Sequence, residues 1–270
     1  MDICEFVRSF EKYSKLSDEE ILNLKQLDLS ANRFTCLPES IGKLTHLQSL
    51  YLSCNQLTSL PESFGKLTKL QSLYLSRNRF ISLPESFGNL CNLEKLYLSD
   101  NRLTSLPESL GNLRNIKELW LSDNQLASLP ESIGKLTNLQ SLYLHDNELI
   151  FLPESLGNLS SLQKLSLSAN RFTCLPDSIG NLSNLKILYL FNNRLTSLPE
   201  SLGNLSNLKE LYLSRNQLND QSQNVLKTLV MTNSVITELT TDNFDFSEEL
   251  LRNLRKEHAP GRTTLKSVEF

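Results

Sequence analysis

The sequence predicts an α/β solenoid, a horseshoe in which short strands stack into one concave parallel sheet of about ten strands. Three observations predict it: a recurring leucine pattern, a fixed period of 23 residues, and proline and glycine at fixed places in each period. A fixed period in this range is typical of solenoids, whose neighbouring repeats share one core. Helical caps are expected at both ends, because the last leucines of the stack would otherwise face water.

The leucine pattern is clearest in residues 47–57, which read Leu-Gln-Ser-Leu-Tyr-Leu-Ser-Cys-Asn-Gln-Leu. Leu50, Tyr51 and Leu52 alternate apolar, exposed and apolar, which predicts a strand with one buried face. Asn55 stands where the chain leaves the strand, and its side chain can bond backbone groups there. We therefore expect a ladder of such asparagines, at Asn32, Asn55, Asn78, Asn101, Asn124, Asn147, Asn170, Asn193 and Asn216.

Proline and glycine mark the second half of each repeat. Pro61 suits the start of a helical or 3₁₀ turn and cannot extend a strand, and Gly65 permits a tight bend. Eight of the nine prolines and eight of the nine glycines occupy these two slots. With this punctuation the chain resembles the leucine-rich-repeat family, in its 23-residue Leu-Pro-x-x-Ile-Gly-x-Leu subtype, over about residues 21–246. The resemblance implies a horseshoe that binds proteins, mostly through its concave face.

The N-terminal end, residues 1–20, is expected to be a helical cap. Ile3, Phe6, Val7 and Phe10 follow helical spacing, which predicts an amphipathic helix over residues 2–13. Residues 17–20 fit a capping box that leads into a second short helix. Nine 23-residue repeats then occupy residues 21–218.

The C-terminal end changes character. Residues 219–258 predict a helical last repeat and cap: a helix that begins after Asn219 or Asp220, a tenth strand over residues 236–241, and a final helix from Asp245 or Ser247. The longer spacing of this repeat resembles the ribonuclease-inhibitor type. Residues 259–270 carry little pattern and are expected to form a loose tail.

Composition narrows the class of protein. The net charge of −3 gives no electrostatic case for nucleic-acid binding, and no run is long enough for membrane insertion. The five cysteines (Cys4, Cys36, Cys54, Cys91 and Cys174) form no evident pairs, and the N-terminus lacks the pattern of a signal peptide. We therefore expect a monomer in the cytoplasm, or one delivered into a host cytosol without a classical signal peptide.

Residues that point outward from the strands and vary between repeats are the candidate binding residues. The outward column between the two strand leucines is largely aromatic: Tyr51, Tyr74, Tyr97, Trp120, Tyr143, Tyr189 and Tyr212, with Ser166 in the seventh strand. Tyrosine and tryptophan dominate binding hot spots. Stacked tyrosines also suit a parallel sheet and would be copied by recent duplication, so a purely structural role stays open.

Two flanking columns also vary. In one, Asp100, Asp123 and Asp146 form either an acidic strip for a basic partner or a solvated edge. The other is serine except for His145 and Phe191. Because the seventh strand carries only small outward residues, we expect a pit there for a partner side chain.

No catalytic, cofactor or metal site is predicted. His145 beside Asp146 is the only candidate general-base pair, and with no nucleophile evident we interpret it as a contact pair. No phosphate-binding loop and no cluster with metal-ligand spacing occurs.

The prediction is therefore a non-catalytic protein-protein interaction module that binds a partner protein on its concave face. Its near-identical repeats resemble those of single-module bacterial repeat proteins, including Legionella-like effectors that act on host proteins. Two alternatives stay open. One is a substrate-recognition or adaptor subunit of a ubiquitin ligase or signalling scaffold, with a second partner at the N-terminal helix. The other is a glycan-binding module that uses the aromatic column.

Overall fold

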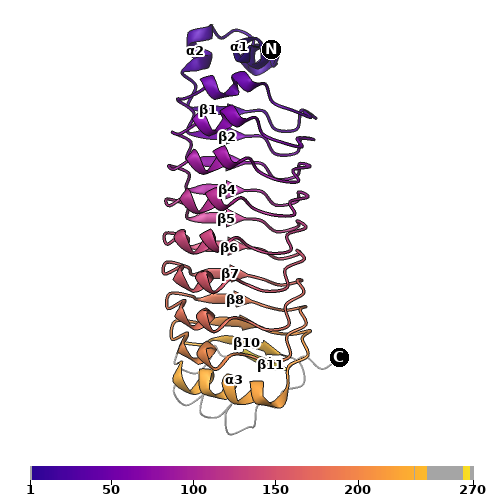
Figure 1. Cartoon of the computed structure of the whole chain (residues 1–270), viewed down its shortest axis with the longest axis vertical. Coiled ribbons are helices and arrows are strands. Elements are labelled where there is room, and N and C mark those ends of the chain that lie inside the picture. The colour runs from indigo at the N-terminus through magenta and orange to yellow at the C-terminus, as the bar shows by residue number, and fades with distance from the viewer. Residues whose placement is uncertain (1, 234, 242–263, 268–270) are drawn as a thin grey trace. The chain divides into compact units, whose positions relative to one another are not determined.

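The computed structural model describes residues 2–233, 235–241 and 264–267 of the 270-residue chain. The chain divides into two compact units, Met1–Leu126 and Ala127–Phe270, and each is described by itself. Within each unit a short strand, a turn and a short helix repeat along the chain, and the strands lie side by side (Figure 1). The predicted α/β leucine-rich solenoid with a parallel sheet is confirmed.

Unit 1 contains five strands and four of the repeated 3₁₀ helices. The strands are β1 (Gln26–Asp28), β2 (Ser49–Tyr51), β3 (Ser72–Tyr74), β4 (Lys95–Tyr97) and β5 (Glu118–Trp120), and the helices are η2 (Glu39–Lys43), η3 (Glu62–Lys66), η4 (Glu85–Asn89) and η5 (Glu108–Asn112). Each strand pairs in parallel with the next, so that identical positions of successive repeats face one another, as Leu50 faces Leu73.

Unit 2 continues the pattern and adds a true helix. Its strands are β6 (Ser141–Tyr143), β7 (Lys164–Ser166), β8 (Ile187–Tyr189), β9 (Glu210–Tyr212), β10 (Glu238–Thr241) and β11 (Thr264–Ser267). Its helices are η6 (Glu131–Lys135), η7 (Glu154–Asn158), η8 (Asp177–Asn181), η9 (Glu200–Asn204) and α3 (Asp220–Thr232). The strands are parallel, in chain order.

The predicted asparagine ladder closes each turn. Asn101 is typical: its Nδ2 donates to the carbonyl oxygens of Leu75 (3.1 Å) and Leu98 (3.0 Å), and its Oδ1 accepts from the Phe80 N–H (3.1 Å). These backbone groups are buried, and buried backbone groups must be paired. One side chain therefore satisfies backbone groups of two repeats.

The repeated glycine serves close packing rather than the bend that we expected. A Cβ on Gly157 would lie 2.5 Å from the carbonyl oxygen of Ser178 in the next repeat. The same approach, at 2.3 to 2.5 Å, is found at Gly42, Gly65, Gly88, Gly134 and Gly180. At Gly203 the Cβ would meet only a Thr228 methyl, at 3.6 Å. Glycine is thus required wherever one 3₁₀ helix stacks on another, and not where α3 replaces the next one.

The N-terminal cap contains α1 (Ile3–Arg8), η1 (Glu11–Tyr13) and α2 (Asp18–Leu22). The single helix predicted over residues 2–13 is wrong, because Phe10 is extended (φ −95°, ψ 133°). The extended backbone brings the Phe10 ring against Phe6 and Phe34, with centroids 5.5 and 5.4 Å away. We attribute the end of the helix to this packing, which partly buries the Phe10 ring against the first repeat.

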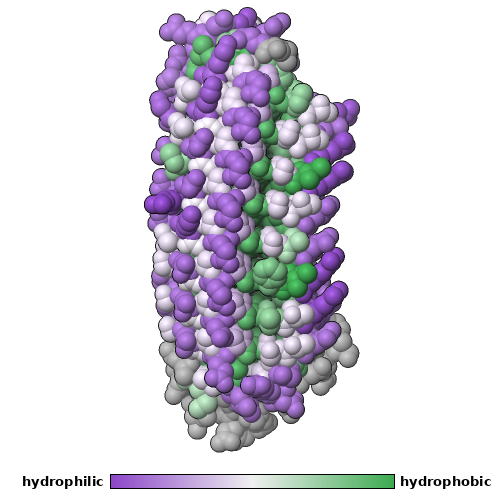
Figure 2. All heavy atoms as spheres, in the orientation of Figure 1, coloured by the Kyte–Doolittle hydropathy of each residue, from purple (hydrophilic) through white to green (hydrophobic). Residues whose placement is uncertain are grey.

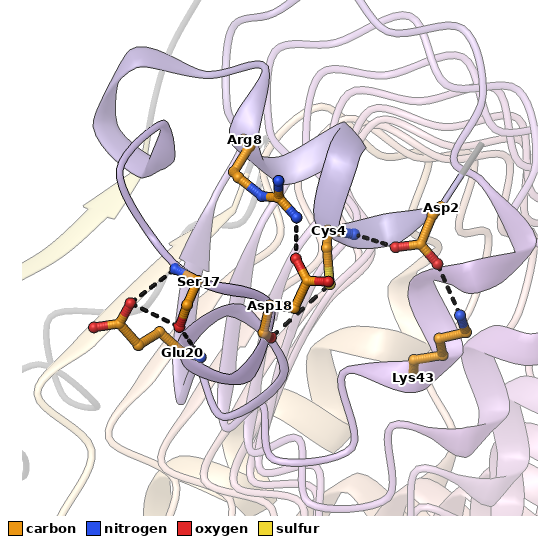
Figure 3. A network of polar contacts seen from close by, with 7 residues as sticks. All are labelled: Asp2, Cys4, Arg8, Ser17, Asp18, Glu20 and Lys43. Atoms are coloured by element: carbon orange, nitrogen blue, oxygen red, sulfur yellow. Dashed lines mark hydrogen bonds and ion pairs between the residues drawn. The ribbon is translucent and has the colours of Figure 1, made fainter.

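Polar contacts hold this cap to the first repeat (Figure 3). Asp2 accepts from the Cys4 N–H (2.9 Å) and from Lys43 Nζ (2.8 Å), and these bonds lower the pKa of Asp2 to about 2, the Lys43 bond contributing most. Arg8 pairs with Asp18. The predicted capping box is present, with Ser17 and Glu20 bonded reciprocally.

The C-terminal predictions have mixed outcomes. Helix α3 begins as expected, with the Asn219 side chain accepting from Ser222 N–H (3.1 Å), and β10 is the predicted tenth strand. The final helix expected from Asp245 or Ser247 lies outside the described residues. The loose tail expected over residues 259–270 contains β11, which pairs in parallel with β10. The unpaired edge of a sheet favours the pairing of a further strand. The periodic leucine pattern could not reveal β11, because this segment lacks that pattern.

Candidate protein-binding face

The outward column of unit 1 forms a row of stacked aromatic rings. Parallel strands lie about 4.8 Å apart, and the ring centroids follow this spacing, with 4.5 Å between Tyr51 and Tyr74 and 4.7 Å between Tyr74 and Tyr97. The Trp120 ring is tilted by 39° to Tyr97, at 5.5 Å. All four side chains are half-buried, so their edges face solvent while their faces cover one another.

A charged cluster adjoins this aromatic row. The Glu118 carboxylate accepts from the Tyr97 hydroxyl (2.9 Å) and pairs with Lys95 Nζ (3.0 Å). Partial burial opposes ionisation of Glu118, but the bonds from Lys95 and Tyr97 outweigh it, and the pKa of this carboxyl lies below its usual value. The cluster therefore keeps opposite charges in fixed positions beside Trp120. Lys95 and Glu118 were not among the predicted binding residues, although the first outward position of the strands varies and could have indicated them.

In unit 2 the aromatic column is interrupted at β7. Tyr189 and Tyr212 stack at 4.8 Å, and the Tyr212 hydroxyl lies 3.2 Å from Glu210 Oε2. Burial raises the pKa of both tyrosines, and nearby glutamates raise it further. Tyr143 instead meets His145 edge to face, at 6.5 Å.

The floor of the predicted pit at β7 is buried rather than open. Ser166 is 7% exposed and Ser168 is 1% exposed. His145 lies across this strand, with Nδ1 3.2 Å from Ser166 Oγ. Phe191 is 43% exposed, so an apolar side chain faces solvent on an otherwise polar column. Sequence position alone could not show that His145 reaches the neighbouring strand.

This contact also corrects the expectation that no nucleophile type lies near His145. A hydroxyl does lie beside the imidazole, but it is buried, and a substrate would have to reach it through neighbouring side chains. The hydrogen bond orients the histidine on the sheet face.

The aspartate column has a conformational reason that the sequence pattern does not reveal. Asp100, Asp123 and Asp146 have φ of 60°, 55° and 54°. Left-handed backbone occurs at the same slot in each repeat, at Ala31, Cys54, Arg77, Asp100, Asp123, Asp146, Ala169, Asn192 and Arg215. Aspartate and asparagine tolerate this conformation better than most residues. The turn alone therefore favours aspartate here, with or without a basic partner.

An exposed parallel sheet face carried on leucine-rich repeats defines a class of protein, the repeat scaffolds whose strand residues are free to contact other molecules. A model of the leucine-rich repeat region matches residues 5–101 and 95–171, and a leucine rich repeat model matches residues 162–218. The chain belongs to the leucine-rich-repeat family.

Three solved structures illustrate the likeness. The plant peptide hormone receptor RGFR1 in complex with RGF2 is 32% identical, with a TM-score of 0.66 over 76% of this chain and 34% of the receptor chain. The Arabidopsis receptor kinase HAESA, in complex with the peptide hormone IDA and the co-receptor SERK1, is 32% identical, with a TM-score of 0.68 over 84% of this chain and 40% of that one. YopM from Yersinia enterocolitica is 31% identical, with a TM-score of 0.60 over 76% and 41%.

The chain thus spans about two fifths or less of the length of these three proteins. Among curated proteins no sequence matches it. In the part of the chain that the structure describes, no helix combines the length and the apolar character needed to cross a membrane.

Proposed function

We propose that the chain binds a protein partner through its sheet face and performs no catalysis itself. The single observation that carries the proposal is the aromatic row of unit 1, Tyr51, Tyr74, Tyr97 and Trp120, stacked in register on β2 to β5. The rings are already held in place, so binding would immobilise few side chains. The Lys95–Glu118 pair beside Trp120 would fix the orientation of the partner.

Unit 2 would offer the partner a second set of apolar contacts, at Tyr189, Phe191 and Tyr212. Tyr143 and His145 would form a further contact pair. The likeness to peptide hormone receptors supports a partner that presents a peptide segment. Asp100, Asp123 and Asp146 would guide a basic partner, in addition to their role in the turns.

The finer proposal is a bacterial effector that acts on a host protein in a reducing cytosol. It is supported by the likeness to YopM and by the four exposed free cysteines. The alternative adaptor role needs a second partner at the N-terminal cap. Phe6 and Phe10 need no such partner, since they pack on Phe34 of the first repeat.

Affinity capture with a matched pair of variants tests the proposal. Tyr74→Ser/Trp120→Ser removes the aromatic surface with a residue that the same slot already accepts at Ser166. We expect this variant to lose a protein that the wild type captures from a eukaryotic cytosolic lysate, because truncating central aromatic residues costs about 2 kcal/mol or more each. Glu62→Gln/Glu85→Gln on η3 and η4 is the control and should capture that protein normally. Equal capture by the serine variant would reject the aromatic row of unit 1 as the binding site.

A further inference from the structure

The repeats provide an internal comparison for the slots just before each Leu-Pro pair. Most repeats place threonine or alanine and then serine or cysteine there, but the sixth places Ile150 and Phe151. These side chains are 50% and 56% exposed. Since the other repeats fold with small residues at the second slot, the fold does not require Phe151. An apolar pair exposed without a structural need indicates a contact with another molecule.

Phe151 borders a hollow in unit 2, on a different surface from the sheet face. The hollow has a volume of about 360 Å³ and lies between the segments that precede η7 and η8. Its apolar lining includes Phe151, Leu152 and Pro176, together with the exposed Cys174. Figure 2 shows that hydrophobic residues on the visible face gather in a narrow band flanked by hydrophilic residues.

The charged part of the hollow is acidic. Glu154 and Asp177, which begin η7 and η8, both line it. Glu154 Oε2 accepts from the Ser178 N–H (3.2 Å), and within the described residues no hydrogen bond or ion pair to the Asp177 carboxylate is found. Arg171, three residues before Cys174, is paired with Glu148 (3.2 Å), which offsets its charge.

We propose that this hollow docks an extended segment of a protein partner in which an apolar side chain stands next to lysine or arginine. The apolar side chain would pack on Phe151 and Pro176 and displace water from the hollow. The neighbouring cation would reach Asp177 and Glu154, whose carboxylates would otherwise repel an acidic segment. This surface is separate from the aromatic row, so the chain would hold a partner by two faces, or hold two partners.

Protection of Cys174 from alkylation measures occupancy of the hollow. Three probe peptides differ only at their centre: Lys-Phe-Lys, Glu-Phe-Glu and Lys-Ser-Lys, each flanked by glycine and serine. Peptide mass spectrometry follows N-ethylmaleimide addition at Cys174 and at Cys36, which occupies the same repeat slot in unit 1. At about four times its Kd the Lys-Phe-Lys peptide should slow Cys174 about fivefold, because the rate follows the unoccupied fraction. Cys36 should be unaffected, and the other two peptides should protect neither cysteine.

Three variants separate the contributions of the apolar and the charged side chains to peptide binding in the hollow. Phe151→Ser, which restores the residue of the other repeats, and Asp177→Asn should each abolish most of the protection, whereas Ile81→Thr, at the equivalent of Ile150 in unit 1, should not change it. Equal protection of Cys36, equal protection by the acidic peptide, or unchanged protection in Phe151→Ser would each overturn the proposal. A wild-type dimer that Phe151→Ser converts to a monomer in sedimentation would also overturn it, because the occupant would then be a second copy of the chain. None of these readouts depends on Tyr74 or Trp120, so they test the hollow independently of the sheet face.

Discussion

At each turn one asparagine side chain replaces the hydrogen bonds that a strand or helix would supply. The amide has both donors and an acceptor in fixed positions, and Asn101 uses them on Leu75, Leu98 and Phe80. Aspartate at this slot would lack the donors, and serine would be too short. The sequence predicted this role, because an asparagine that recurs at a fixed interval from a strand is typical of a side chain that bonds the backbone of a turn.

Asn101→Ala should therefore destabilise the fold strongly. It leaves the Phe80 N–H buried without a partner. It also removes one of two amide donors from the Leu75 and Leu98 carbonyls, which Asn78 and Asn124 still reach. We expect a loss of about 2 kcal/mol in the free energy of unfolding. Urea unfolding followed by circular dichroism measures it. Asn32→Ala is the control, because Asn32 is exposed and donates to Ser30 of its own turn. If both variants lose the same stability, the buried ladder does not stabilise the turns in the way proposed.

Two other residue-level features could not be predicted from the sequence. The left-handed backbone at Asp100 and its equivalents is held by the turn, and the mixture of alanine, arginine and aspartate at that slot hides it. The contact between His145 and Ser166 depends on the side-chain conformation of a residue in the neighbouring repeat. Periodicity reports which face a residue is on, and it cannot report which neighbour that residue touches.

At the scale of elements, the recurring glycine allows neighbouring 3₁₀ helices to stack closely, whereas the sequence predicted that it permits a bend. The Ser178 carbonyl approaches the site of the missing Cβ at Gly157, and the same approach recurs within each unit. The sequence predicted a bend at the recurring glycine, but the reason for the glycine lies in the adjacent helix, which a single repeat does not show.

Gly157→Ala and Gly203→Ala form a matched pair that tests this role of glycine in packing. The first would push a methyl group to within 2.5 Å of a carbonyl oxygen, whereas the second makes an ordinary contact at 3.6 Å. We expect Gly157→Ala to lose about 1 to 3 kcal/mol through overpacking, and Gly203→Ala to change stability by less than about 0.5 kcal/mol. Thermal and urea unfolding of the two proteins provide the values. A large loss in Gly203→Ala would show that glycine serves the backbone conformation instead.

The end elements were the least predictable. Phe10 fits a helical stripe, yet it leaves the helix to join Phe6 and Phe34, because packing against the first repeat outweighs helical spacing. Strand β11 pairs with β10 although its segment lacks the leucine pattern. Both departures occur where the repeat ends and its periodic signal stops.

For the whole chain, the same periodicity that predicts the fold separates the residues that build it from those that are free to bind. Leucine, asparagine, proline and glycine recur because each repeat needs them. The aromatic row stands in a slot that also accepts Asp28 and Ser166, and Phe151 stands in a slot where the other repeats carry serine or cysteine. The family and the protein-binding class follow from this pattern and from the family matches. The identity of the partner does not, because it depends on side chains that the fold leaves unconstrained.

The most direct measurement of the central claim is site-specific photo-cross-linking from the sheet face. A benzoylphenylalanine placed at Tyr74 on β3, and in a second protein at Lys66 on η3, would be irradiated in the lysate used for capture. We predict a discrete protein adduct from position 74 that excess unlabelled wild type removes and excess Tyr74→Ser/Trp120→Ser leaves intact. Adducts from position 66 alone, or equal competition by the serine variant, would contradict binding through the aromatic row.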